Sequence, residues 1–176
     1  PGPKTMEYGG NTTCLEVCGA DLRIVFDAGS GIRPFGTDLV ERGPNAVHIF
    51  LTHFHWDHIQ GFPFFTPAYL PSSQLTVYGT EAGDDRMYRL LSGQMQSLDY
   101  FPVQFSDLGA RILSGDLGGE SRTIDGVQIS YLPVCPFLPS SVWPYLAPAT
   151  SVHTPIHIPL ALHLARPAAS HKWACP

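Results

Sequence analysis

The apolar residues of the first 132 positions fall into short runs of strand length, separated by longer amphipathic stretches. Thr12–Cys18 and Leu22–Phe26 are two such runs, and the turn-compatible residues 19–21 between them predict a β-hairpin. Val47–Leu51 is almost continuously apolar, which is typical of a central strand covered on both faces. Gln74–Tyr78 repeats that pattern.

Two stretches between these runs are predicted to be helical. One helix is expected to begin after the glycine-containing segment 27–31 and to run through Leu39–Arg42, where a Gly-Pro pair stops it. The other is Glu81–Ser92, which has apolar residues at helical spacing and a glycine directly after it. Val127–Leu132 is the last strand that the pattern predicts. Together these elements indicate a layered α/β domain.

The segment that follows the predicted central strand carries three imidazoles and one carboxylate within six positions: His53, His55, Asp57 and His58. In extended backbone His53 and His55 project to the same side, because side chains alternate with a period of two. The turn that follows can bring the other two side chains to the same cavity. Neutral imidazole and carboxylate bind zinc and similar divalent ions, whereas unpartnered polar groups beside an apolar strand carry a desolvation cost. The cluster therefore predicts a metal site.

The composition excludes several classes of protein. The chain has 176 residues, of which 44% are hydrophobic and 14% are charged, as in one soluble domain with a core. Its formal charge of −5 gives no reason to expect strong affinity for nucleic acid or anionic lipid. The four cysteines are too few for a disulfide scaffold, and no basic-then-apolar leader is present, so we expect a cytoplasmic protein.

Residues 133–176 differ in composition from the rest of the chain. They contain nine of the 17 prolines and four of the eight histidines, but no glycine and no acidic residue. The charge-free stretch 126–165 is interrupted by prolines, so no membrane span is expected. We therefore divide the chain into a folded part, residues 1–132, and an atypical proline-rich tail, residues 133–176. The tail either lacks fixed structure or was not selected to complete this fold, for example after a reading-frame change, and we favour the second interpretation.

Three motifs together resemble those of the metallo-β-lactamase superfamily of metallo-hydrolases. His-x-His-x-Asp-His at 53–58, with Gly61 three residues later, is similar to the first metal motif of this family. Segments 9–17 and 26–31 are similar to its opening hairpin and its second-strand motif. Over residues 1–132 the resemblance is strongest to the branch that contains ribonuclease Z and the phosphoribosyl cyclic phosphodiesterases. It implies an αββα sandwich, truncated here to its first half.

The resemblance also implies a site and a reaction. His53 and His55 would bind the first of two metal ions. Asp57 and His58 would bind the second, with zinc expected and manganese or iron as alternatives. The implied function is a metal-dependent hydrolase, foremost a phosphodiesterase that acts through a metal-bound hydroxide on a small-molecule or nucleotide substrate. Asp57 would also be the catalytic residue that orients the hydroxide, while Asp27 would either support the metal loop through hydrogen bonds or be an ordinary turn residue.

The sequence departs from the family in the ligands that would complete the two metal shells. The family supplies a later His, an Asp shared between the ions and a final His, but no acidic residue follows Asp125. Asp116 is the nearest substitute for the shared Asp, and a solvated turn residue is the simpler interpretation. His153 and His157 have helical spacing, but Pro155 lies between them. An inactive chain with an incomplete metal site is therefore one alternative to the phosphodiesterase. A thioester or lactone hydrolase of the same superfamily is another.

Two further expectations concern the covering of the fold and the surroundings of the metal motif. Because the second half of the sandwich is not matched, one face of the sheet is expected to be uncovered. Aromatic side chains are frequent after the metal motif, at Phe62, Phe64, Phe65, Tyr69 and Phe101. We expect them to pack in the core, with a lining for a nucleoside as the alternative. The arginines at 86 and 89 either meet a phosphate or are simply solvated.

Overall fold

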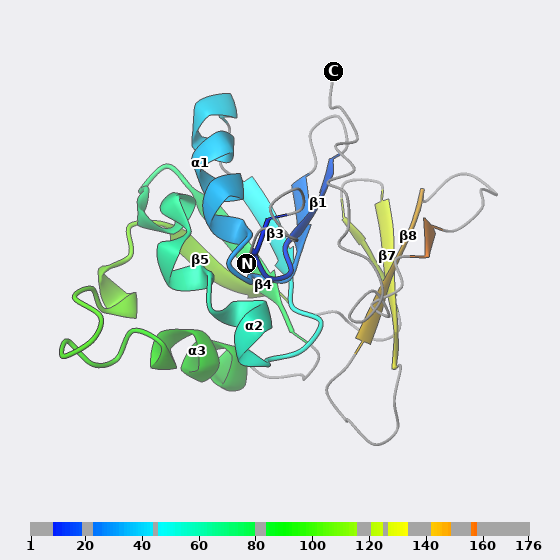
Figure 1. Ribbon diagram of the computed structural model, residues 1–176. Helices are drawn as coiled ribbons and strands as arrows, with labels where there is room; N and C mark the ends of the chain where they lie inside the picture. The colour runs from blue at the N-terminus through cyan, green and yellow to red at the C-terminus, as the bar shows by residue number, and fades with distance from the viewer. Residues whose placement is uncertain are drawn as a thin grey trace.

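A computed structural model of the chain (Figure 1) describes residues 9–18, 23–43, 46–79, 84–115, 121–124, 127–133, 142–148 and 156–157. The strands are β1 (Leu15–Cys18), β2 (Arg23–Phe26), β3 (Ala46–Phe50), β4 (Gln74–Tyr78), β5 (Arg111–Gly115), β6 (Ser121–Ile124), β7 (Val127–Pro133), β8 (Val142–Pro148) and β9 (Ile156–His157). The helices are α1 (Ile32–Arg42), α2 (Trp56–Ile59) and α3 (Asp84–Gly93), with single 3-10 turns at η1 (Phe62–Phe64), η2 (Thr66–Tyr69) and η3 (Phe105–Asp107). In these ranges no helix is long and apolar enough to cross a membrane.

Strands β1 to β5 form the first sheet, in the order β1-β2-β3-β4-β5. The predicted hairpin is confirmed, because β1 pairs antiparallel with β2, with Leu15 opposite Phe26. The other three pairs are parallel, and parallel neighbours need crossover connections, which α1 provides between β2 and β3 and α3 between β4 and β5. β3 lies in the middle of this sheet, as the apolar run predicts.

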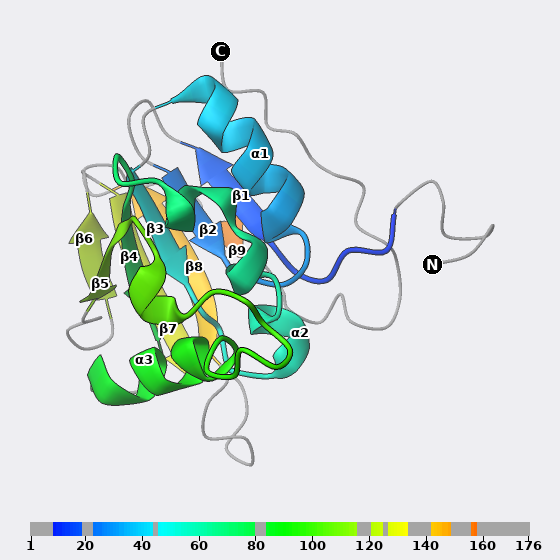
Figure 2. The same ribbon diagram turned by 90° about the vertical axis from the view of Figure 1, so that its left-hand side faces the viewer.

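The helices and the second sheet cover opposite faces of the first sheet. In Figure 1 the helices lie to the left of it and the strands β7 and β8 to its right, and in Figure 2 the helices stand in front. The larger core cluster lies on the helix side and includes Ile32 and Leu39 of α1 packed with Val25, Ile49 and other strand residues. The first sheet is therefore a scaffold covered on both sides, and its strand ends are the places where polar side chains can gather.

Strands β6 to β9 form the second sheet, which is antiparallel throughout. Ile124 of β6 and Ile129 of β7 are buried in one cluster with Phe26, Phe50 and Tyr78 of the first sheet. The expectation of an uncovered face is therefore wrong, because β6 and β7 place apolar side chains on it.

Several elements differ from the sequence pattern. Helix α3 begins at Asp84 in the described residues, and positions 81–83 of the predicted helix lie outside them. β5 was not predicted, because Arg111–Gly115 has only two large apolar residues and is recognised by its pairing with β4. β8 and β9 follow the strand that the pattern predicts as the last, and β8 contains prolines that are unfavourable in a strand interior. The division of the chain at residue 132 stays a prediction.

The aromatic residues that follow the metal motif divide into two groups. Phe62 and Phe65 are 1% and 0% exposed and belong to the core, as predicted. Phe64 is 57% exposed and contacts Phe101 edge to face, with 5.7 Å between ring centroids, so the expectation of core packing is wrong for Phe64.

Candidate metal centre

The histidine-rich motif begins where β3 ends, at the carboxyl edge of the first sheet. Phe50 is the last residue of β3, and the Leu51 N–H still donates to the carbonyl of Tyr78 on β4 (2.8 Å). Asp27 lies beside this point because Phe26 of β2 is in register with Phe50, and the Asp27 N–H donates to the Phe50 carbonyl (2.9 Å). The residues that follow the two neighbouring parallel strands β2 and β3 therefore lie close together at the carboxyl edge of the sheet. Ligand sites of α/β proteins commonly form at this edge.

The Asp27 carboxylate is fully buried and accepts hydrogen bonds from two residues. Its Oδ1 accepts from the backbone N–H of Thr52 (2.9 Å) and from the Thr52 hydroxyl (2.8 Å), and its Oδ2 accepts from Nδ1 of His58 (2.8 Å). Asp27 has a φ of 64°, in the left-handed region that Asp adopts more readily than most residues. This backbone turn directs the carboxylate beneath the metal motif.

These hydrogen bonds determine which ring nitrogens carry a lone pair. The single hydroxyl proton of Thr52 goes to Asp27 (2.8 Å), so the Thr52 oxygen accepts from the Nδ1–H of His53 (3.1 Å). His58 likewise donates its Nδ1–H to Asp27 (2.8 Å). In the neutral tautomers that result, Nε2 of both rings is an acceptor. One buried carboxylate thereby holds two imidazoles in the form that binds a metal ion.

Four of these side chains form what we call the floor of the site. The floor consists of Asp27, Thr52, His53 and His58, whose exposed fractions are 0%, 2%, 7% and 1%. They are fixed by one another and by the surrounding core, because buried polar groups keep the hydrogen bonds that compensate their desolvation.

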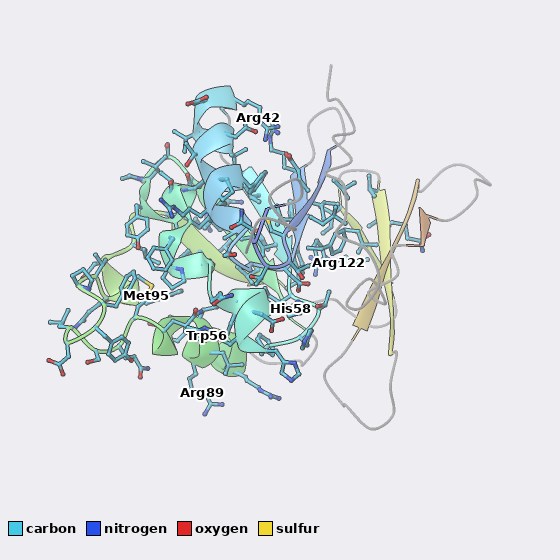
Figure 3. The ribbon with its side chains drawn as sticks, in the orientation of Figure 1. Arg42, Trp56, His58, Arg89, Met95 and Arg122 are labelled. Carbon is cyan, nitrogen blue, oxygen red and sulfur yellow. The ribbon has the colours of Figure 1, made fainter. Side chains whose placement is uncertain are left out.

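Three consecutive residues form what we call the rim. The rim consists of His55, which is exposed, Trp56, whose indole is 62% exposed, and Asp57, whose side chain is 43% exposed. Figure 3 shows Trp56 and His58 on the short helix α2, which begins directly after His55, with Arg89 on α3 beneath it. The site is therefore closed on the floor side and open on the rim side.

Each floor histidine faces one rim side chain. Nε2 of His53 lies 3.1 Å from Nδ1 of His55. Nε2 of His58 lies 3.5 Å from Oδ2 of Asp57. Two donors that each lie 2.0–2.1 Å from one tetrahedral zinc ion are about 3.3 Å apart. Both separations therefore fit a shared divalent ion, and the two pairs adjoin because the centroids of the His53 and His58 rings are 4.0 Å apart.

The two floor histidines have pKa values that move in opposite directions. Burial, together with the neighbouring imidazole of His58, lowers the pKa of His53 to about 4, so this ring is neutral at physiological pH. Burial also acts to lower the pKa of His58, but the hydrogen bond and the negative charge of Asp27 outweigh it and raise the pKa above its ordinary value. His53 is therefore a ready lone-pair donor, whereas His58 gains a proton more easily and gives it up to an incoming cation.

The described residues supply two donors to each candidate ion. Within the ranges given above, no group of three or more His, Cys, Asp or Glu side chains is arranged to hold a metal ion. Asp116 and His153 lie outside the described residues, and His157 is placed only by its backbone in β9. The assignment of His53, His55, Asp57 and His58 as ligands, and of Asp57 as catalytic residue, stays a prediction.

Sequence reasoning missed the part that Thr52 has in this network. Its hydroxyl connects Asp27 to Nδ1 of His53, so it relays the effect of the carboxylate to the second imidazole. The available signal was a hydroxyl residue placed directly before the first histidine, at the end of a buried strand.

Gly61 allows the metal motif and the loop after β2 to lie against each other. The Gly61 N–H donates to the Ala28 carbonyl (2.9 Å), and the Ala28 N–H donates to the His58 carbonyl (2.7 Å). A Cβ added to Gly61 would overlap the carbonyl oxygen of Gly29. The close approach of the two backbones is therefore what positions Asp27 under His58.

The comparison with protein families identifies the class of this chain. The Metallo-beta-lactamase superfamily matches residues 8–133, and the chain belongs to this superfamily. Its members are hydrolases and usually bind metal ions, often zinc. No curated protein matches the chain.

Several solved structures are similar to this chain. They include a diphosphatase from the PhnP family, which is 17% identical with a TM-score of 0.50 over 77% of this chain and 49% of that chain. The metallo-beta-lactamase fold protein YhfI from Bacillus subtilis is 21% identical (TM-score 0.49, 79% and 51% covered), and the short form of human tRNase Z is 16% identical (TM-score 0.47, 79% and 59% covered). The chain thus spans about half the length of the solved structures it matches.

Proposed function

We propose that this chain forms the metal-ligand loop of a metal-dependent hydrolase that acts on phosphodiesters. The observation that supports the proposal is the presence of two adjoining donor pairs, with donors 3.1 Å and 3.5 Å apart, whose floor members are held as acceptors by Asp27. The family supplies the chemical context, because its members are metal-binding hydrolases.

The residues have distinct parts in this proposal. Two divalent ions, when bound, would supply the positive charge that polarises a phosphate and activates water. His53 and His55 would hold one ion, and Asp57 and His58 the other. Asp27 keeps the floor rings in place, so that no rotamer or tautomer has to change when the substrate arrives. Asp57 is partly accessible to solvent, which allows its carboxylate to accept a hydrogen bond from the attacking water.

A phosphodiester is the substrate that we favour, and a small molecule or a nucleotide is its proposed form. Divalent ions, if held by the two donor pairs, would supply the positive charge that an in-line displacement at phosphorus requires. The same motif also serves acyl chemistry within this fold, so a thioester and a lactone belong in the assay as comparison substrates.

A second candidate is a chain without turnover that holds a single ion loosely. It is favoured by one observation, namely that the described residues contain no group of three or more ligands. Catalytic zinc sites ordinarily have three protein ligands, so two donors per ion would bind weakly.

Metal analysis and turnover of the full 176-residue chain distinguish the two candidates. The hydrolase should retain about two equivalents of zinc after dialysis and hydrolyse bis-p-nitrophenyl phosphate. His55→Ala and His58→Ala should each abolish that turnover. His48→Gln, a change at a histidine of β3 outside the motif, is the matched control and should retain it. Less than one equivalent without turnover supports the second candidate, and full activity in either alanine variant contradicts the site assignment.

A further inference from the structure

The open side of the candidate site is centred on Trp56. His55, Trp56 and Asp57 are consecutive and accessible, whereas the floor histidines are 7% and 1% exposed. Consecutive Cα atoms are only about 3.8 Å apart, so the indole is attached directly between two of the candidate ligands. Trp56 therefore belongs to the accessible rim beside the donor pairs, on the same short helix as His58 (Figure 3).

The packing of the described residues does not account for the exposure of Trp56. Its indole is 62% exposed and belongs to neither hydrophobic cluster of the described residues. Tryptophan is on average a highly buried residue, and leaving its apolar area in water forgoes the stabilisation that burial gives. The neighbouring Phe54, in contrast, is half-buried and packs against the helix-side core.

A positive charge lies close to Phe54, two residues before Trp56. The Arg86 guanidinium of α3 lies 5.8 Å from the centroid of the Phe54 ring, and Phe54 is the residue between His53 and His55. Arg86 is also exposed. The metal motif and its surroundings therefore include an accessible aromatic face, a cation beside Phe54 and two donor pairs. This combination is complementary to a ligand with both a phosphate and a flat aromatic group, and it is poorly matched to a purely apolar partner.

We infer that Trp56 is the surface on which the base of a nucleotide phosphodiester stacks, with Arg86 on the side of the phosphate. The inference rests on the proposed function and names its substrate class. Stacking on an exposed indole is tolerant of base identity, because every base has a flat face. Trp56 is thus a substrate-binding residue that discriminates nucleotide esters from esters without a base.

Two esters that share one leaving group test this role. Thymidine 5′-(p-nitrophenyl phosphate) and methyl p-nitrophenyl phosphate both release p-nitrophenolate, so they differ only in the base-bearing group. Trp56→Ala should raise the KM for the thymidine ester about tenfold and leave the KM for the methyl ester within about twofold. An equal rise for both esters, or no rise for either, would overturn the inference.

Further variants separate stacking from a general disturbance. Trp56→Phe should restore most of the discrimination, because a ring remains available for stacking. Tyr100→Ala removes another exposed aromatic side chain, 69% accessible, and should change neither KM. Arg86→Gln should raise the KM for both esters by a similar factor, because it acts on the phosphate. A rise confined to the thymidine ester in Arg86→Gln would contradict the placement of Arg86.

Binding of phosphate monoesters makes the inference testable even if the proposed function fails. If the wild-type chain hydrolyses neither ester, calorimetric titration with thymidine 5′-monophosphate and with ribose 5-phosphate replaces the kinetics. Trp56→Ala should then weaken binding of the monophosphate about tenfold and leave that of the sugar phosphate unchanged. Equal affinity of the wild type and the variant for the monophosphate would overturn the inference.

Discussion

The floor and the rim of the candidate site come from one short segment of sequence but are held in different ways. His53 and His55 are only two residues apart, yet the first is 7% exposed and the second is exposed. The ring of His53 is oriented by its hydrogen bond to the Thr52 hydroxyl, which is itself hydrogen-bonded to Asp27. Nδ1 of His55 lies within hydrogen-bond distance of Nε2 of His53, the other ring of its donor pair (3.1 Å).

This difference indicates that the floor residues are held in place in advance, whereas the rim residues are the ones exposed to an incoming ligand. The floor is fixed before any ion or substrate arrives, because its polar atoms are buried and satisfied by one another. The rim remains in contact with solvent, so a ligand can reach its side chains. We therefore expect changes in the floor to alter the free energy of unfolding, and changes in the rim to alter binding alone.

Gly61→Ala should have the largest effect on the free energy of unfolding, a loss of about 4 kcal/mol. The added Cβ would overlap the Gly29 carbonyl oxygen and force apart the two loops that join Asp27 to His58. Urea denaturation measures the loss. Gly93→Ala is the matched control, because an added Cβ there meets nothing within 4 Å, and it should change stability by less than about 1 kcal/mol. A Gly61→Ala variant as stable as the wild type would show that the fold does not depend on the close contact between the backbones at Gly61 and Gly29.

Asp27→Asn should cost about 2–3 kcal/mol, because an amide has one acceptor atom where the carboxylate has two. The remaining oxygen cannot serve both Thr52 and His58, and the pKa of His58 should fall once the negative charge is gone. Chemical denaturation gives the first quantity and an NMR titration of the His58 ring gives the second. Asp38→Asn, whose side chain is 60% exposed, should change stability by less than about 0.5 kcal/mol. An unchanged pKa of His58 in Asp27→Asn would contradict the network.

The metal-free chain should lose stability as the pH falls from 6.5 toward 4, in part through His53. The pKa of His53 is lowered from 6.5 to about 4 in the folded chain, so only the unfolded chain takes up its proton in this window. The contribution is present above pH 6.5, is lost as the pH falls, and has a slope of at most about 1.4 kcal/mol per pH unit. Denaturation series in EDTA should show a flatter profile for His53→Gln than for the wild type.

His58 should contribute with the opposite sign. Its pKa is raised in the folded chain, so its stabilising contribution is present at acidic pH and is lost as the pH rises through the folded value. His58→Gln should therefore flatten the neutral side of the same profile. Identical profiles of stability against pH for His53→Gln and His58→Gln would contradict the opposite pKa shifts of the two rings.

His55→Ala should have the smallest effect on stability, less than about 0.5 kcal/mol, because the side chain is exposed and belongs to the rim. Its effect should appear in metal retention instead, since one donor pair loses a member. Thermal denaturation and zinc content of the same dialysed sample measure both quantities. A large loss of stability with unchanged zinc content would reverse the distinction between floor and rim.

The apolar pattern was sufficient to predict the strands that form the middle of the first sheet. Val47–Leu51 corresponds to β3 at Ala46–Phe50, and Gln74–Tyr78 corresponds to β4 without a shift. These strands are covered on both faces, so their sequences are nearly continuous apolar runs. β5 escaped prediction because it lies at the edge of the sheet, where Arg111 and Ser114 point to solvent and weaken the pattern.

The chemistry of the motif was visible in the sequence, but its internal connections were not. Four ligand types within six positions are recognisable wherever they occur. The hydrogen bond between Asp27 and His58 joins residues 31 positions apart, and it exists because β2 and β3 pair in parallel and in register. A pattern of neighbouring residues cannot reveal a contact between residues so far apart in the sequence. The sequence therefore left two alternatives for Asp27, and the pairing of the strands decided between them.

The sequence by itself determined the class of fold, the location of the His-x-His-x-Asp-His motif after a buried strand, and the superfamily to which the chain belongs. Tertiary structure alone decided which of these side chains are buried and which ring nitrogens bear lone pairs. It also decided that Trp56 faces solvent. The reason is physical: periodicity and residue type act within a few neighbouring positions, whereas burial and hydrogen-bond partners depend on residues that only the pairing of distant strands brings together.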